Sequence, residues 1–233
     1  MASNHPNEPD RRRVIAGLAA IGIGTALSPR QAFAQGLGLS AILGRATDSA
    51  LDRLARPGAF YDDEAIRIAL PILGRPSSGL LGRLMGAGER LGVLDGITRT
   101  INDAAGTAAG EAKPIFRDAI DDLSWTDAPG IVSQSDGGTQ YLRRSSNDRL
   151  EGRLRPLVDD ALSGVGAYDR FDRLSEKHSF IRRAGLDRES INRSVTEQAL
   201  DGIFAYVGRE ERAFRANPLG NIGGALGDML GRD

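Results

Sequence analysis

Apolar residues recur every three or four positions along most of the chain, a spacing that places them on one face of an α-helix. The first such stripe spans residues 39–54 and ends at Arg56-Pro57-Gly58. Alternation with a period of two is confined to residues 66–70, where a short extended piece is possible. The pattern therefore predicts an all-α fold.

Further helical stripes follow at residues 77–91, 94–123, 150–165, 168–174 and 194–207, and a glycine-rich amphipathic piece covers 219–230. Pro114 and Pro156 lie inside two stripes, where a missing amide hydrogen divides or kinks a helix. Residues 136–138 (Asp-Gly-Gly) indicate a turn, and residues 194–197 (Ser-Val-Thr-Glu) fit a capping box. Neither an internal repeat nor a long linker interrupts the pattern, so we expect a single-domain helical bundle with kinked helices over residues 35–233.

The first 34 residues have the order of an export signal. Arg11 and Arg12 precede one variable position and two apolar residues, a mildly apolar run covers about 14 residues (14–27), and Ala32-Phe33-Ala34 offers a small-x-small cleavage site. Paired arginines are read by the twin-arginine export machinery. We expect cleavage after Ala34 and a periplasmic location. The general secretory route and an uncleaved anchor or disordered tail are the alternatives.

Membrane spanning and nucleic-acid binding are not expected of the mature chain. The apolar run of the signal is shorter than the roughly 20 residues that a membrane helix needs, and no later segment is longer and as apolar. The chain carries a net charge of −1, and removal of residues 1–34 takes away four arginines and two acidic residues. Proteins that bind duplex nucleic acid normally present a strongly basic face.

The chain offers few side chains that could bind a transition metal or act as a catalytic nucleophile. The chain has no cysteine and two histidines, of which His5 lies in the predicted signal and His178 near a predicted helix end. Transition metals favour imidazole and thiolate ligands, so neither a metal nor another cofactor is predicted. The adjacent acidic pairs, such as Glu210-Glu211, are interpreted as solvated surface residues, because neighbouring helical positions do not share a face.

Several strings in order resemble one family of exported bacterial proteins, the domain of unknown function DUF4197, from Leu39 to the C-terminus. They are Glu111-Ala112-Lys113-Pro114-Ile115-Phe116, Asp127-Ala128, Thr139-Gln140-Tyr141-Leu142-Arg143, Val195-Thr196, Ala199-Leu200-Asp201-Gly202-Ile203-Phe204, Glu210-Glu211 and Arg215-Ala216-Asn217-Pro218. The chain departs from the family pattern at Ala69, where members often carry proline, and in its glycine-rich tail. The resemblance implies an exported, helical, single-domain protein and no particular activity.

The resemblance also implies a set of candidate polar positions for any shared binding site. These are Glu111, Lys113, Thr139, Tyr141, Arg143, Asp201, Glu211 and Arg215. Buried salt bridges between helices would explain the same set, and we favour that interpretation over ligand binding.

Three functions remain open from the sequence. The leading hypothesis is a non-enzymatic periplasmic binding or scaffolding protein whose ligand is a lipid or another amphiphile, because prolines and small residues can leave a groove between helices. A hydrolase that uses carboxylates and Lys113 is the second, and it requires these side chains to converge in an open cleft. The third is a structural protein that self-associates through its C-terminal segment, where glycines are spaced four apart.

Overall fold

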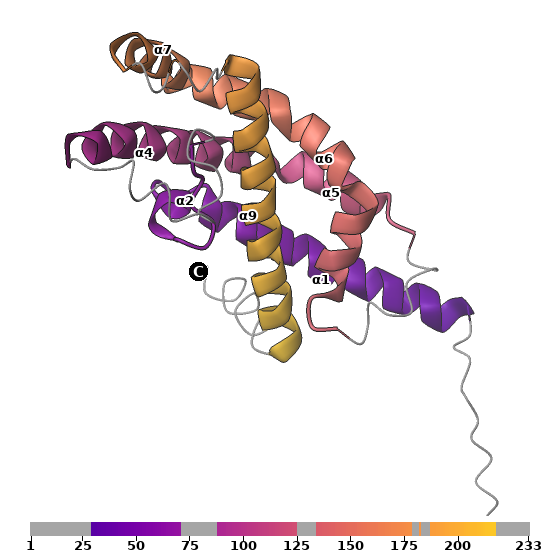
Figure 1. Cartoon of the computed structure of the whole chain (residues 1–233). Helices are drawn as coiled ribbons and strands as arrows, with labels where there is room; N and C mark the ends of the chain where they lie inside the picture. Colours follow the sequence, from indigo (N-terminus) through magenta and orange to yellow (C-terminus); the bar gives the residue numbers. More distant parts are fainter. Residues whose placement is uncertain (1–28, 71–87, 125–133, 179–181, 183–186, 218–233) are drawn as a thin grey trace, which may run out of the picture.

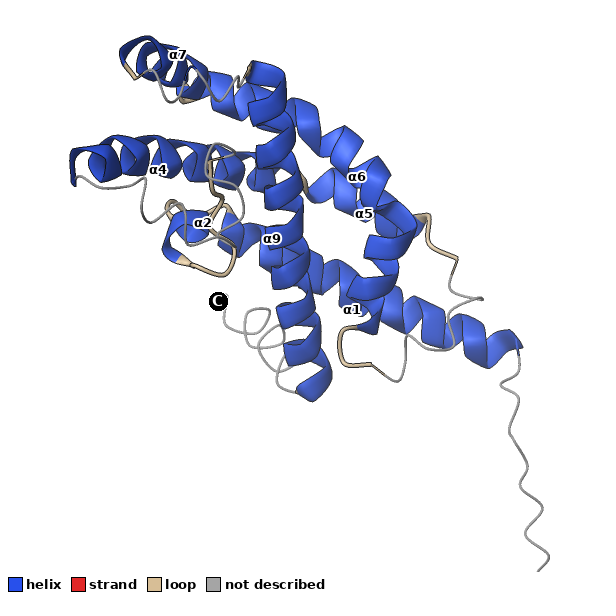
Figure 2. Cartoon of the chain, in the orientation of Figure 1, coloured by secondary structure: helices blue, strands red, loops and turns tan. Residues whose placement is uncertain are grey.

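The computed structural model describes residues 29–70, 88–124, 134–178, 182 and 187–217. These residues form seven α-helices and no strand, which confirms the predicted all-α class (Figure 2). The helices are α1 (Pro29–Leu54), α2 (Ala59–Asp62), α4 (Gly88–Glu111), α5 (Lys113–Asp121), α6 (Gly137–Gly164), α7 (Ala167–Lys177) and α9 (Arg188–Ala216). The predicted helix at 77–91, except its last residues, and the predicted C-terminal piece at 219–230 lie outside the described residues.

The long helix α9 is the centre of the arrangement. It crosses the other helices and packs most extensively against α1 and α6, with further contacts to α4 (Figure 1). Its apolar residues are buried on more than one face, because it is covered from several sides. Leu200, Ile203 and Val207 are among those that lose nearly all their exposure to water.

The predicted first stripe is confirmed as the buried face of α1. Leu43, Ala46, Ala50 and Leu54 are fully buried, and the helix ends at Leu54, before the predicted Arg-Pro-Gly stop. The small alanines leave room for neighbouring helices to approach closely. The short helix α5 packs against α1 and α6.

Pro114 divides two helices, as predicted, whereas Pro156 lies within a helix that continues on both sides of it. Pro114 lies in the first turn of α5, where its missing amide hydrogen removes no helical bond, and the preceding helix α4 ends at Glu111. Pro156 lies inside α6. Its ring removes one internal hydrogen bond of that helix.

The alternating residues 66–70 form a non-helical segment without a partner strand among the described residues. Side-chain amides take the place of that strand. The Asn102 amide on α4 accepts from the Ile68 N–H (2.8 Å) and donates to the Ile68 carbonyl (2.9 Å). The Gln198 amide on α9 does the same for the next residue, Ala69, at 3.0 Å for both bonds. The segment is thereby fixed between α4 and α9, and a proline at position 69 could not donate its bond.

The predicted capping box of the last long helix is wrong by seven residues. The capping box is formed by Asp187 and Ser190: the Asp187 side chain accepts from the Ser190 N–H (2.8 Å), and the Ser190 hydroxyl accepts from the Asp187 N–H (3.0 Å). Ser194 lies inside α9, where its hydroxyl accepts from Gln198. The predicted stop is confirmed, since α9 ends at Ala216 and Asn217 is its C-cap.

No described helix has the length and apolarity needed to cross a membrane. The predicted signal falls mostly on residues 1–28, which lie outside the described residues. The predicted cleavage site after Ala34 lies within α1, so cleavage there would leave a helix that begins near Gln35.

We expect the Asn102→Ala substitution to lower the free energy of unfolding by about 2–4 kcal/mol. The substitution leaves the buried N–H and carbonyl of Ile68 without partners, and each unpaired buried group costs about 1–3 kcal/mol. Urea unfolding followed by circular dichroism measures the change. Asp103→Ala, at the exposed neighbouring position on α4, is the control and should change stability by less than about 0.5 kcal/mol. Equal losses for the two variants would contradict the role of Asn102.

Candidate functional site

The most enclosed polar group of the predicted set is the carboxylate of Glu211 on α9. Its side chain is 1% exposed. One carboxylate oxygen, Oε2, accepts from the Thr139 N–H at 2.7 Å and from the Thr139 hydroxyl at 2.6 Å. The other, Oε1, accepts from the Gly138 N–H at 3.0 Å. These two N–H groups begin α6 and have no partner within their own helix, so Glu211 caps α6 from another helix.

Arg215 completes this cluster from the next turn of α9. Its guanidinium donates to Glu211 Oε1 from Nε at 3.0 Å and from a terminal nitrogen at 2.6 Å. Gly138 is required for the close approach, because a Cβ at that position would lie 2.8 Å from Glu211 Oε1. Thr139, Glu211 and Arg215 of the predicted set therefore do converge. Both oxygens of the Glu211 carboxylate thus accept hydrogen bonds from other groups of the protein.

The turn predicted at residues 136–138 is wrong in part. α6 begins at Gly137, and Asp136 is its N-cap but makes no capping hydrogen bond with its side chain. The Asp136 carboxylate instead pairs with Arg212 of α9. Glu211 performs the capping from 72 residues away, which local sequence cannot reveal.

The prediction that Glu210 and Glu211 are solvated surface residues is also wrong, because both are buried. Glu210 points toward α1, whereas Glu211 points toward α6. The Glu210 carboxylate accepts from the Ser49 hydroxyl (2.9 Å) and pairs with Arg53 (3.0 Å), both on α1. Adjacent helical positions point in different directions, as expected. Since α9 is covered on both sides, the two directions lead to two buried contacts.

The other predicted positions belong to separate contacts. Arg143 of α6 pairs with Asp201 of α9, and its guanidinium lies 5.3 Å from the centre of the Phe204 ring. The Tyr141 hydroxyl donates to the Ser124 carbonyl at 2.7 Å. These contacts link helices, as the favoured interpretation expects, but the Arg143–Asp201 pair is about half exposed rather than buried.

Lys113 and Glu111 lie at the junction of α4 and α5. The Lys113 ammonium pairs with Asp52 of α1 at 2.6 Å, and Glu111 is exposed. Glu111, Lys113, Asp201 and Glu211 therefore do not converge in one cleft, which the hydrolase hypothesis requires. Among the described residues, no group of three or more His, Asp or Glu side chains is placed to hold a metal ion.

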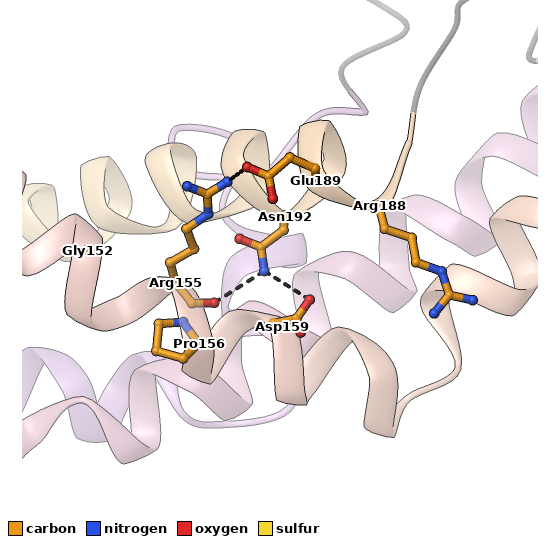
Figure 3. Close-up of a pocket in the computed structure, with 7 residues that line it drawn as sticks. All are labelled: Gly152, Arg155, Pro156, Asp159, Arg188, Glu189 and Asn192. Carbon is orange, nitrogen blue, oxygen red and sulfur yellow. Dashed lines mark hydrogen bonds and ion pairs between the residues drawn. The ribbon is translucent and has the colours of Figure 1, made fainter.

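Two surface pockets are lined mostly by residues that the sequence did not single out. The larger, about 560 Å³, lies between α6 near Pro156 and the beginning of α9 (Figure 3). It is lined by Gly152, Arg155, Pro156, Asp159, Arg188, Glu189 and Asn192. We refer to it as the α6–α9 pocket. Pro156 was predicted as a kink, and that kink was the available sequence signal for a break in helix packing.

Asp159 and Asn192 form the middle of the α6–α9 pocket, and Arg155 pairs with Glu189 at one end (Figure 3). The Asn192 amide donates to the Arg155 carbonyl (3.2 Å) and to Asp159 Oδ1 (3.3 Å). The Tyr168 hydroxyl also donates to Asp159 Oδ1, at 2.7 Å. Burial, followed by this hydrogen bond to Asp159, raises the pKa of the Tyr168 phenol above its ordinary value.

The smaller pocket, about 270 Å³, lies between α4 and α7. Its lining combines apolar side chains with three cations: Gly96, Ile97, Arg170, Arg173, Leu174 and Lys177. We refer to it as the α4–α7 pocket. Arg170 also donates to the Thr100 hydroxyl of α4 at 3.0 Å, which ties the two helices together at one side of the pocket.

Comparison with known proteins identifies the family. A family model described as a protein of unknown function (DUF4197) matches residues 30–228. The chain belongs to this family. The DUF4197 match begins at the second residue of α1 and includes all eight of the predicted polar positions. No curated protein and no solved structure shows significant similarity to the chain.

We expect Glu211→Gln to lower the free energy of unfolding by about 2–4 kcal/mol, because it removes the partner charge of the poorly exposed Arg215 and points an amide donor at the donors of α6. Urea unfolding measures the loss. Glu197→Gln, at an exposed position on the same helix, is the matched control and should be nearly neutral. A shared unfolding midpoint for the two variants would show that α6 does not depend on this carboxylate.

Proposed function

We propose that this member of the DUF4197 family is an exported, non-enzymatic binding protein of the periplasm whose ligand is an anionic amphiphile. The proposal rests on one observation, the α4–α7 pocket, in which an apolar floor is bordered by cations. Ile97 and Leu174 provide the apolar contact, and Arg170, Arg173 and Lys177 provide the positive charge.

The three cations lie along one edge of α7 at spacings of three and four residues, where like charges repel one another. Among the described residues, no carboxylate lies within ion-pair distance of any of them. The acidic edge of the same helix behaves differently, since Asp169 and Asp172 both approach Arg188 of α9. A bound anion would relieve the repulsion along the basic edge, which favours an anionic headgroup.

The size of the pocket favours a small amphiphile. Its volume of about 270 Å³ is slightly below the roughly 300–1,000 Å³ typical of small-molecule pockets. Such a space suits one acyl chain with its carboxylate better than a whole phospholipid. A fatty acid is therefore the ligand class that combines the required charge, apolar surface and size.

The two alternative functions have less support. The hydrolase lacks a convergent cleft, because its proposed residues take separate partners. A self-associating structural role depends on residues 219–230, which lie outside the described part of the chain. A scaffolding role is compatible with the fold but follows from no particular contact.

We expect the protein to bind dodecanoate, and the double variant Arg173→Glu, Lys177→Glu to bind it at least about tenfold more weakly, a difference of roughly 1.4 kcal/mol. Isothermal titration calorimetry measures both affinities. The matched control is Arg144→Glu, which reverses an exposed arginine of α6 that does not line the pocket. Its affinity should equal that of the unchanged protein.

Dodecanol, with the same chain and no charge, separates the two parts of the proposal. It should bind much more weakly than dodecanoate, because it cannot use the basic edge. Equal binding of the two compounds, or an unchanged affinity in the double variant, would refute the proposed site.

The proposed location has its own test. We expect the double variant Arg11→Lys, Arg12→Lys to remain in the cytosol as the uncleaved chain, while the unchanged protein appears in the periplasm beginning at Gln35, because the twin-arginine machinery reads the arginine pair itself. Cell fractionation with N-terminal sequencing provides the readout. Continued export of the variant would indicate the general secretory route, and an intact N-terminus on exported protein would contradict cleavage after Ala34.

A further inference from the structure

We propose that the α6–α9 pocket is a second binding site, which takes a small zwitterion of the amino-acid type, meaning a free amino acid or a dipeptide. The pocket shares no lining residue with the α4–α7 pocket. This proposal therefore does not rest on the proposed amphiphile function. Its volume of about 560 Å³ lies within the roughly 300–1,000 Å³ typical of ligand sites.

The pocket wall contains a backbone acceptor that α6 cannot use. Pro156 has no amide hydrogen, so the carbonyl of Gly152, four residues earlier, lacks its helical donor. Gly152 has no side chain, and nothing lies within 4 Å of the position that a Cβ would occupy. This part of the wall therefore has no side chain of its own.

Asp159 supplies a second acceptor in the pocket wall, about two helical turns further along α6 than Gly152. Its Oδ1 atom receives the hydroxyl of Tyr168 and the amide of Asn192. No described residue donates to its Oδ2 atom. An ammonium group has several donors and a positive charge, so it matches this carboxylate oxygen.

Arg188 supplies the positive partner at the other end of the pocket from the Arg155–Glu189 pair (Figure 3). Its side chain is 61% exposed, and its nearest carboxylate contacts, to Asp172 at 3.4 Å and Asp169 at 3.7 Å, are both long. The guanidinium also lies over the Tyr168 ring, 5.1 Å from its centre. A guanidinium held this loosely can still bind a ligand carboxylate through two parallel hydrogen bonds.

The balance of charges decides between ligand classes. Arg155 and Arg188 face Asp159 and Glu189 around one pocket, so its formal charges cancel. A simple anion would meet two carboxylates, and a simple cation would meet two guanidinium groups. A zwitterion can place its ammonium at Asp159 while its carboxylate meets Arg188, so both of its charges are matched.

The test uses the dipeptide Ala-Ala, free alanine, and two blocked dipeptides, N-acetyl-Ala-Ala and Ala-Ala-amide. Each is titrated into the isotope-labelled protein to about 10 mM, ten times a millimolar Kd, and amide shifts are followed by NMR. We expect saturable shifts at residues of the pocket with at least one of the two zwitterions. Both blocked forms should bind about tenfold more weakly or worse, because each lacks one charge.

Two charge-removing variants locate the site. Asp159→Asn keeps the shape and an acceptor for Tyr168 but loses the carboxylate charge, and Arg188→Gln loses the guanidinium. Each should weaken binding by about tenfold or more, while the controls Asp160→Asn and Arg193→Gln, at exposed positions on the same helices, should not.

Three results would each overturn the proposal: no saturable shift with either zwitterion, equal binding of the blocked dipeptides, or unchanged binding in both pocket variants. Thermal unfolding of every variant shows whether it is folded. If Asp159→Asn fails to fold, Arg188→Gln decides alone, since its side chain is largely exposed. None of these results bears on dodecanoate binding, so the two proposed sites can fail separately.

Discussion

The fold depends on α9 satisfying polar groups that other elements cannot satisfy for themselves. The clearest case is the Glu211 carboxylate, which accepts from the first turn of α6 and is held by Arg215. A helix start buried without partners is costly, because its N–H groups have no intrahelical acceptors. Gln198 performs the same task for Ala69 in the extended segment. The position of α9 is therefore set by hydrogen-bond demand as well as by its apolar contacts.

Most of the eight polar positions suggested by the family resemblance contact other parts of the protein, so they do not form one ligand site. Arg143 and Asp201 link two helices at the surface, and the hydrogen bonds and ion pair of Glu211 offset the cost of burying its carboxylate. Their chemistry is used by the protein itself. A ligand site must therefore be sought where charges lack close partners or where a helical carbonyl lacks its usual donor, and the two surface pockets meet these conditions.

The helix α7 has acidic residues on one edge and basic residues on another, and each edge lies near one of the two pockets. Its acidic residues Asp169 and Asp172 approach Arg188 beside the α6–α9 pocket, and its basic residues Arg173 and Lys177 line the α4–α7 pocket. One short helix thus contributes opposite charge to two neighbouring surfaces. The proposed ligands differ accordingly, since one surface is basic and apolar while the other carries balanced charge.

The sequence by itself determined the helical class, the first buried stripe, the division at Pro114 and the end of α9, because apolar periodicity and proline act through neighbouring residues. It also identified Thr139, Glu211 and Arg215 as related positions through the family strings. Only the tertiary structure decided that Glu210 and Glu211 are buried, that α6 begins at Gly137, and that cations of α7 and the part of α6 around Pro156 border pockets. These features depend on partners dozens of residues away, and a local pattern contains no information about which distant group will supply the missing hydrogen bond or charge.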